Sequence, residues 1–120
     1  MTNFHLEVHT MKSLQMQAFD KEIQRVRDAL ANRDDDCAYQ HLERAHILGQ
    51  RYVWPHTLTH FLFLLIGYRR RDYREILGQL ARIPIGMLGS ALNMAPTGNT
   101  GGANVSMFKK MPIPDDLQES

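Results

Sequence analysis

The chain has 120 residues, which suffice for a single domain with one core. Hydrophobic residues make up 43% of it and charged residues 22%, a balance that is typical of globular proteins and excludes a disordered chain. A nucleic-acid-binding protein normally has a concentrated basic surface, whereas the formal net charge of this chain is only +1. We therefore expect no nucleic-acid partner.

The first predicted helix covers residues 14–32. Its apolar residues recur at i, i+4, i+7 and i+11, which places them on one face of a 3.6-residue period: Phe19, Ile23, Val26 and Leu30. The acidic run at residues 34–36 then predicts a turn and an N-cap for a second helix over residues 36–49. We expect this second helix to bury Ala38, Leu42 and Ala45.

The third predicted helix begins near Pro55, a residue that the first turn of a helix tolerates well. Residues 58–66 are apolar on nearly every face, so we predict that this helix is the most buried of the set. The longest apolar run, residues 61–67, is much shorter than the roughly twenty residues of a membrane span, which predicts no membrane partner. This result, the single cysteine (Cys37) and the lack of a signal-peptide pattern predict a cytoplasmic protein without an intramolecular disulfide.

Asp72 and Glu75 form a D-x-x-E capping box at the start of a fourth helix. Its expected buried stripe is Ile76, Leu80, Ile83 and Met87. Pro84 interrupts this stripe, because it cannot donate a hydrogen bond to the carbonyl of Leu80 and its ring clashes with the preceding turn. We therefore predict a kink or break at Pro84, followed by a short helical segment at residues 86–93.

Glycine and proline recur from residue 95 onward and disfavour helix. The same segment is nevertheless too apolar for a free tail, since it contains Val105, Met107, Phe108, Met111, Ile113 and Leu117. We expect an extended C-terminal strap that packs on the helices or on a partner subunit. The predicted organisation is a helical domain at residues 14–94 and a Gly/Asn/Pro-rich tail at residues 95–120.

The predicted fold class is all-α, a four-helix array of two helical hairpins with the C-terminal strap. An internal match pairs Ala45 with Ala81 and Ile47 with Ile83, which is similar to tetratricopeptide-type pairing. A solenoid of such units needs about three repeats to be stable. A compact arrangement of four helices is therefore the expectation.

The placement of three histidines and one glutamate predicts a metal site. Glu43 and His46 have the E-x-x-H spacing by which helical bundles present a carboxylate and an imidazole to one ion. His56 and His60 are four residues apart, so both rings leave the same face of the third helix. A short connection between the second and third helices brings these positions together. We predict that Glu43, His46, His56 and His60 bind one divalent transition metal, for which Zn²⁺, Fe²⁺, Ni²⁺ and Cu²⁺ are all suitable.

A structural role is the alternative for each of these histidines, either as a buried ring that donates to a backbone carbonyl or as a helix cap. His41 is left out of the set because its spacing from His46 turns it to another face of the helix. No residue pattern names a reaction or a substrate, so no catalytic residue is predicted.

Four segments of the chain are distinctive as a set: residues 41–50 (HLERAHILGQ), 78–82 (GQLAR), 98–102 (GNTGG) and 111–114 (MPIP). Together they resemble a small bacterial family of proteins of unknown function. The resemblance covers about residues 15–117. It supports His46, His56 and His60 as positions to test, and it implies no reaction.

The leading functional hypothesis is a small helical metal-binding protein that acts as a sensor, carrier or buffer. The alternative is a helix-hairpin module for protein–protein interaction without metal, with a second copy of the chain or another protein as its partner. An enzyme that uses the ion as a Lewis acid is a third hypothesis, for which the sequence names no substrate.

Overall fold

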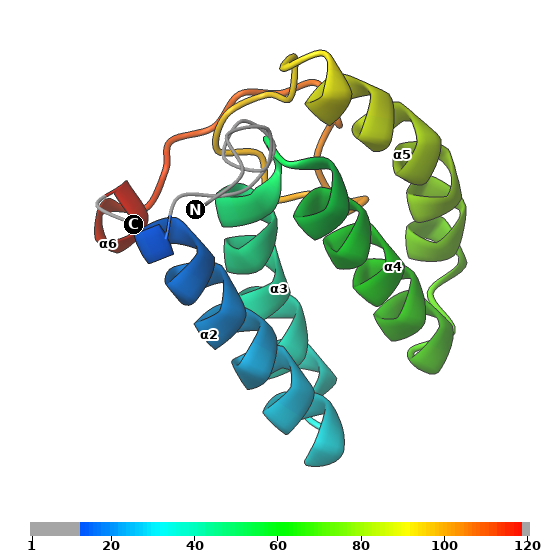
Figure 1. Cartoon of the computed structure of the whole chain (residues 1–120). Coiled ribbons are helices and arrows are strands. Elements are labelled where there is room, and N and C mark those ends of the chain that lie inside the picture. The colour runs from blue at the N-terminus through cyan, green and yellow to red at the C-terminus, as the bar shows by residue number, and fades with distance from the viewer. Residues whose placement is uncertain (1–12, 119–120) are drawn as a thin grey trace.

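The computed structural model of the chain describes residues 13–118 (Figure 1). Its helices are α2 (Ser13–Ala31), α3 (Asp35–Gly49), α4 (Val53–Arg69), α5 (Tyr73–Ala91) and the single turn α6 (Asp115–Gln118). Residues 13–118 contain no strand, which confirms the all-α prediction. Within this range, no helix has both the length and the apolar character that crossing a membrane requires.

The four long helices pack as two hairpins, as predicted. α2 packs against α3 and α4 packs against α5, while a contact between α3 and α4 joins the two pairs. The core is formed mainly by α2, α3 and α4, and its members on these helices larger than alanine are Phe19, Ile23, Val26, Leu42, Ile47, Leu48, Phe63 and Ile66. The apolar stripe predicted for the first helix and the buried positions predicted for the second all lie in this core or against it.

Aspartate side chains cap two of the helices. Oδ1 of Asp34 accepts a hydrogen bond from the backbone N–H of Cys37 at 3.1 Å, and Oδ1 of Asp72 accepts one from the N–H of Glu75 at 3.0 Å. Both predicted N-caps are therefore confirmed. The second half of the capping box does not form, because the Glu75 carboxylate instead accepts hydrogen bonds from Tyr39 and Gln79.

The prediction that the third helix is the most buried is wrong, because α3 buries seven of its 15 residues and α4 buries seven of its 17. One face of α4 buries Phe63 and Ile66, but Phe61 is 53% exposed and Tyr68 is 73% exposed. Leu77 and Leu80 of α5 are also exposed, and Ile76 of α5 lines a groove with Phe61 and Tyr68. The apolar residues of α4 therefore lie on two faces of the helix, and only one of these faces packs on the core.

α5 differs from its prediction in two ways. It continues without a break from Tyr73 to Ala91, with Pro84 inside it. Pro84 and Leu80 are exposed, so the Leu80 carbonyl that loses its intrahelical donor lies on the side of the helix that water reaches. The buried face is also not the predicted apolar stripe, because α5 buries Glu75, Gln79, Arg82 and Ser90.

The tail crosses the end of the bundle where α3 joins α4, and it returns to the start of α2 (Figure 1). Backbone carbonyls of Asn99, Gly101 and Val105 accept hydrogen bonds from side chains of α3 and α5. Leu117 of α6 is part of the core. The tail packs on the helices, but residues 97–108 make a series of turns, and the N–H of Met111 bonds to the carbonyl of Thr97, so this part folds back on itself. α6 corrects the expectation that the tail contains no helix.

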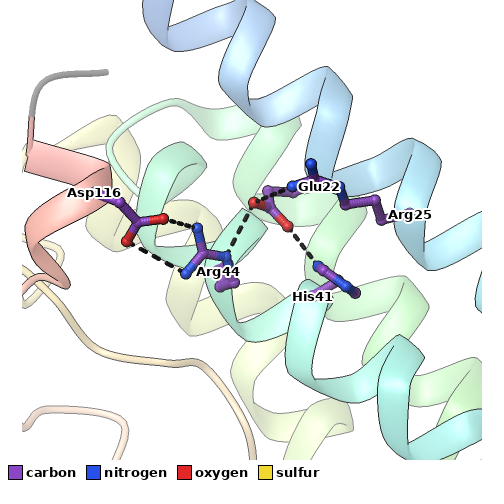
Figure 2. Close-up of polar contacts among 5 residues, drawn as sticks. All are labelled: Glu22, Arg25, His41, Arg44 and Asp116. Carbon is purple, nitrogen blue, oxygen red and sulfur yellow. Dashed lines mark hydrogen bonds and ion pairs between the residues drawn. The ribbon is translucent and has the colours of Figure 1, made fainter.

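A charged network around Glu22 connects the tail to α2 and α3 (Figure 2). The Glu22 carboxylate is buried and lies 3.0 Å from Nε of Arg44 and 2.7 Å from Nδ1 of His41. Arg44 also pairs with Asp116 of α6. His41 therefore takes part in a hydrogen-bonded network between helices, and it is not in the group of histidines that contains His46.

Candidate metal centre

Three of the four predicted ligands meet at the α3–α4 connection. His46 lies in the last turn of α3, and His56 and His60 lie one turn apart in the first half of α4. All three are buried, and they form a group whose ligand atoms lie within 4.8 Å of one another. Nε2 of His60 is 3.2 Å from Nε2 of His46 and 2.9 Å from Nε2 of His56.

Glu43 is not brought into this group. The side chains of residues 13–118 that can share one ion at this position are the three histidines alone. Burial raises the pKa of Glu43, and the nearby Glu75 carboxylate raises it further. The E-x-x-H spacing therefore identified a histidine of this cluster but does not bring its carboxylate to the same point.

The outer nitrogen of His46 is fixed by the tail. Its Nδ1 lies 2.7 Å from the backbone carbonyl oxygen of Asn99. Because a carbonyl can only accept, Nδ1 must carry the proton, and Nε2 keeps its lone pair. Asn99 is itself buried, and its side-chain amide donates to the carbonyls of Ser106 and Lys109 at 2.8 and 2.7 Å.

The outer nitrogen of His60 is fixed by α5. Its Nδ1 lies 2.6 Å from Oε1 of Gln79. The orientation of this amide follows from its other contacts, since Nε2 of Gln79 donates to the Glu75 carboxylate at 2.6 Å and to the Gly101 carbonyl at 2.9 Å. Oε1 therefore accepts from Nδ1 of His60, and Nε2 of His60 also keeps its lone pair.

The same logic applies to His56, whose Nδ1 bonds to Oγ of Ser90. The hydroxyl of Ser90 donates its proton to the backbone carbonyl of Gln50. Its oxygen is therefore left to accept from Nδ1 of His56. Each imidazole thus has an outward N–H bonded to a hydrogen-bond acceptor, an arrangement that is usual for histidines that bind a metal through the other nitrogen.

As a result, three unprotonated Nε2 atoms face one another in a buried space. Burial lowers the pKa of His56 to about 3 and that of His60 to about 4, and it lowers the pKa of His46 well below its ordinary range. All three rings are therefore neutral near pH 7, so no proton is held between them. Three converging lone pairs repel one another unless a cation lies between them.

Two glycines make room for this cluster. A Cβ at Gly86 of α5 would lie 3.3 Å from Nε2 of both His56 and His60. A Cβ at Gly101 of the tail would lie 2.8 Å from Nε2 of His46, and the φ of Gly101 is +89°, which disfavours other residues. Backbone therefore approaches the imidazoles closely from two sides.

A cavity of about 320 Å³ opens onto the three histidines. Its walls come from the second half of α5 and from the tail, and they are mostly apolar: Ile85, Leu88, Leu92, Met94, Met107 and Phe108. Arg82 and Gln50 also line it. An ion bound by the three Nε2 atoms would have protein on one side and this cavity, named here the histidine pocket, on the other.

The residues that orient the imidazoles were not predicted. Gln79 and Ser90 belong to a stripe of polar and small residues on α5 at i, i+4, i+7, i+11 and i+15: Glu75, Gln79, Arg82, Gly86 and Ser90. This periodicity was present in the sequence, but the neighbouring apolar stripe on the same helix gave the more familiar pattern. No periodic pattern in the sequence points to Asn99, because this residue contacts His46 through its backbone carbonyl and lies in an irregular segment.

Comparison with known proteins gives a family and no function. Searches of curated proteins and of solved structures gave no match. The model of the family described as "Protein of unknown function (DUF3703)" matches residues 13–120, which include all three histidines and the residues that orient them. The match agrees with the resemblance of the sequence to a small family of unknown function. The chain therefore belongs to the DUF3703 family.

Proposed function

We propose that this protein binds one divalent transition-metal ion through Nε2 of His46, His56 and His60, and that it serves as a metal sensor, carrier or buffer. The observation that carries the proposal is the direction of three hydrogen bonds. Each Nδ1–H donates to an oxygen outside the cluster, so three Nε2 lone pairs converge on one point. A cation at that point relieves their mutual repulsion and uses all three.

The spacing of the nitrogens fits such an ion. Two imidazole nitrogens bound to one tetrahedral Zn²⁺ at about 2.0–2.1 Å lie about 3.3 Å apart. The Nε2 atoms of His46 and His60 are 3.2 Å apart, and those of His60 and His56 are 2.9 Å apart. Small movements of the rings are therefore enough to bind the ion.

The ligand set limits the choice of metal. Neutral imidazoles suit Zn²⁺, Fe²⁺, Ni²⁺ and Cu²⁺, and Cu²⁺ forms the tightest complexes of these ions with nitrogen ligands. Three protein ligands leave a coordination position that faces the histidine pocket, whereas structural zinc sites are closed by four protein ligands. An open position supports exchange of the ion with the surroundings, which a sensor, carrier or buffer requires.

The experiment is a metal titration of protein purified without an affinity tag, combined with elemental analysis. We expect one ion per chain for Zn²⁺. The variants His46→Gln and His60→Gln each remove one ligand, and His41→Gln is the matched control because His41 lies in the Glu22 network on the same bundle. The two site variants should lower the affinity by more than 100-fold, while the control keeps the affinity of the wild type.

Two outcomes would contradict the proposal. One is wild-type protein that takes up no stoichiometric Zn²⁺, Ni²⁺ or Cu²⁺. The other is an affinity that falls equally in the His41→Gln control, which would place the ion outside the histidine cluster.

A second candidate function, protein–protein interaction, is favoured by the exposed apolar surface of α4 and α5. Phe61, Leu65 and Tyr68 of α4 border a groove that Ile76 of α5 also lines. Monomeric proteins rarely expose large contiguous apolar patches, and self-association through a two-fold axis is the commonest way to cover one. We accordingly propose that this surface packs against a second copy of the chain.

Light scattering over a range of protein concentrations tests this second candidate. Leu65→Glu places a charge in the groove, and Met16→Glu on α2 is a matched control because Leu65 is 43% and Met16 is 42% exposed. The wild type and Met16→Glu should be dimers and Leu65→Glu a monomer. A wild type that remains monomeric at high concentration would contradict this candidate and leave the metal proposal intact.

A further inference from the structure

The histidine pocket has two polar groups that the fold leaves without partners. Nε of Arg82 and Oε1 of Gln50 are buried and have no hydrogen-bond partner among residues 13–118. Arg82 is 9% exposed and Gln50 is 2% exposed, and both residues line the pocket. Both atoms are closed off from solvent, so a ligand in the pocket meets other parts of these two side chains; what they add to the pocket wall is polar character and, at Arg82, a positive charge.

Arg82 is firmly positioned. Its Nη1 donates to the carbonyl of Gly78 at 3.1 Å, and its Nη2 donates to the carbonyl of Val105 at 2.7 Å. These two bonds connect the guanidinium to α5 and to the tail, but both acceptors are neutral carbonyls, so among residues 13–118 Arg82 has no carboxylate in an ion pair. The fixed fork of a guanidinium suits a carboxylate better than a neutral group.

The balance of charge at the site also favours an anion. A histidine binds a metal through a neutral imidazole, so in the loaded site the divalent ion contributes +2 and Arg82 contributes +1. Glu75, which is joined to His60 through Gln79, contributes −1. The remaining positive charge lies beside a mostly apolar cavity, where it is poorly solvated until an anion binds.

The rest of the pocket suits a hydrocarbon. Leu88, Leu92, Met107 and Phe108 form its walls, and its volume of about 320 Å³ is at the lower end of the range of small-molecule sites, about 300–1,000 Å³. The pocket therefore combines one positively charged end with an apolar body of limited size.

We propose that the histidine pocket binds a small organic carboxylate, with the carboxylate at the open position of the metal ion beside Arg82 and the hydrocarbon chain against the apolar walls. This inference rests on the proposed metal site and names the class of ligand that the site takes. The metal supplies the contact to the carboxylate, and the positive charge of Arg82 on the pocket wall favours an anion there.

The test uses the full chain loaded with Co²⁺, whose visible absorption changes when a ligand enters its coordination sphere. Acetate, butanoate and hexanoate are titrated in turn, and hexanol serves as a control with an apolar chain and no charge. We expect the affinity to rise from acetate to hexanoate, by up to about fourfold for each methylene that becomes buried. Hexanol should not change the spectrum.

Two variants test the contributions of the apolar walls and of the charged end separately. Gly89 lines the pocket, and a Cβ there would meet only the backbone nitrogen of Ala95, at 4.0 Å. Gly89→Leu should therefore fill the pocket and abolish the preference for hexanoate while Co²⁺ still binds. Arg82→Gln should weaken all three carboxylates by at least tenfold and keep the dependence on chain length, whereas Arg74→Gln, at an exposed position of the same helix, should have no effect.

The outcomes distinguish this inference from the metal proposal. If Co²⁺ binds but hexanoate leaves its spectrum unchanged or binds no tighter than acetate, the pocket does not take an organic carboxylate and the metal site stands. If Arg82→Gln binds carboxylates like the wild type, the assignment of the charged end is overturned. If Co²⁺ does not bind at all, the metal proposal fails and this inference fails with it.

Discussion

Gln79 and His60 are joined by a hydrogen bond of 2.6 Å between Oε1 of the amide and Nδ1 of the ring. The amide cannot turn over, because its Nε2 donates to the Glu75 carboxylate and to the carbonyl of Gly101. This contact therefore decides which nitrogen of His60 faces the other two histidines. A buried carboxylate on α5 thus orients an imidazole on α4 through one intervening amide.

Replacing Gln79 with leucine should weaken metal binding without removing a ligand. Leucine has a similar volume but accepts no hydrogen bond, so the tautomer and the orientation of His60 are no longer fixed. We expect a loss of affinity of about 10–100-fold, measured by competition with a chelator. Gln24→Leu is the control, since Gln24 forms an exposed hydrogen bond with Asp28 far from the site. Equal affinities in the two variants would show that the bond to Gln79 does not position His60.

A methyl group at residue 86 should interfere with the ion. The Cβ of Gly86→Ala would lie 3.3 Å from Nε2 of His56 and of His60, where the metal must bind. Gly89→Ala is the matched control one turn later on the same helix, because its Cβ meets no atom closer than 4.0 Å. Titration with Zn²⁺ should show weaker binding by Gly86→Ala alone. The control should also be more stable by up to about 1 kcal/mol, because alanine favours helix over glycine.

Truncation of Asn99 should affect both stability and the site. Its side chain donates to Ser106 and Lys109 and accepts from the N–H of Gly101, and these bonds hold the turn that presents the Asn99 carbonyl to His46. For Asn99→Ala we expect the free energy of unfolding to fall by about 1–3 kcal/mol in urea titrations, because buried backbone groups lose their partners. Zn²⁺ affinity should fall with it. Unchanged stability would show that the tail does not depend on this side chain.

Acid should destabilise the metal-free protein through the histidines. The pKa of His60 is lowered to about 4 by burial, while in the unfolded chain it is near its ordinary value of about 6.5. Between these two values the unfolded state binds a proton and the folded state does not, so stability falls as the pH decreases from about 6.5 to 4. The loss from His60 alone is about 3 kcal/mol, at about 1.4 kcal/mol for each unit of pKa difference. Urea titrations at several pH values measure it, and a stability that stays constant between pH 7 and pH 4.5 would contradict the burial of the neutral rings.

The helices and the histidine cluster follow from the sequence because short-range rules decide them. Regular apolar spacing predicted α2 and α3, and aspartates predicted where α3 and α5 begin. His56 and His60 share a face of α4 because they are four residues apart. His46 lies in the last turn of α3, and the short connection to α4 brings it close to them. These features need no knowledge of distant contacts.

The roles of α4 and α5 depended on contacts that spacing cannot show. α5 carries an apolar stripe and a polar stripe side by side, and the polar one faces inward because it completes the hydrogen bonds of the buried imidazoles. α4 therefore meets polar groups on one side and leaves Phe61 and Tyr68 exposed on another. Glu43 was misplaced for a related reason, since its spacing from His46 was suitable but the Glu43 side chain lies near Glu75.

X-ray absorption spectroscopy of the Zn²⁺-loaded, untagged protein tests the central claim most directly, because it identifies the atoms bound to the ion. The geometry of His46, His56 and His60 predicts three imidazole nitrogens at about 2.0–2.1 Å, with at most one further light atom in the shell. A spectrum with fewer than three imidazoles, or with a shell of oxygen atoms only, would show that the three converging rings do not hold the metal.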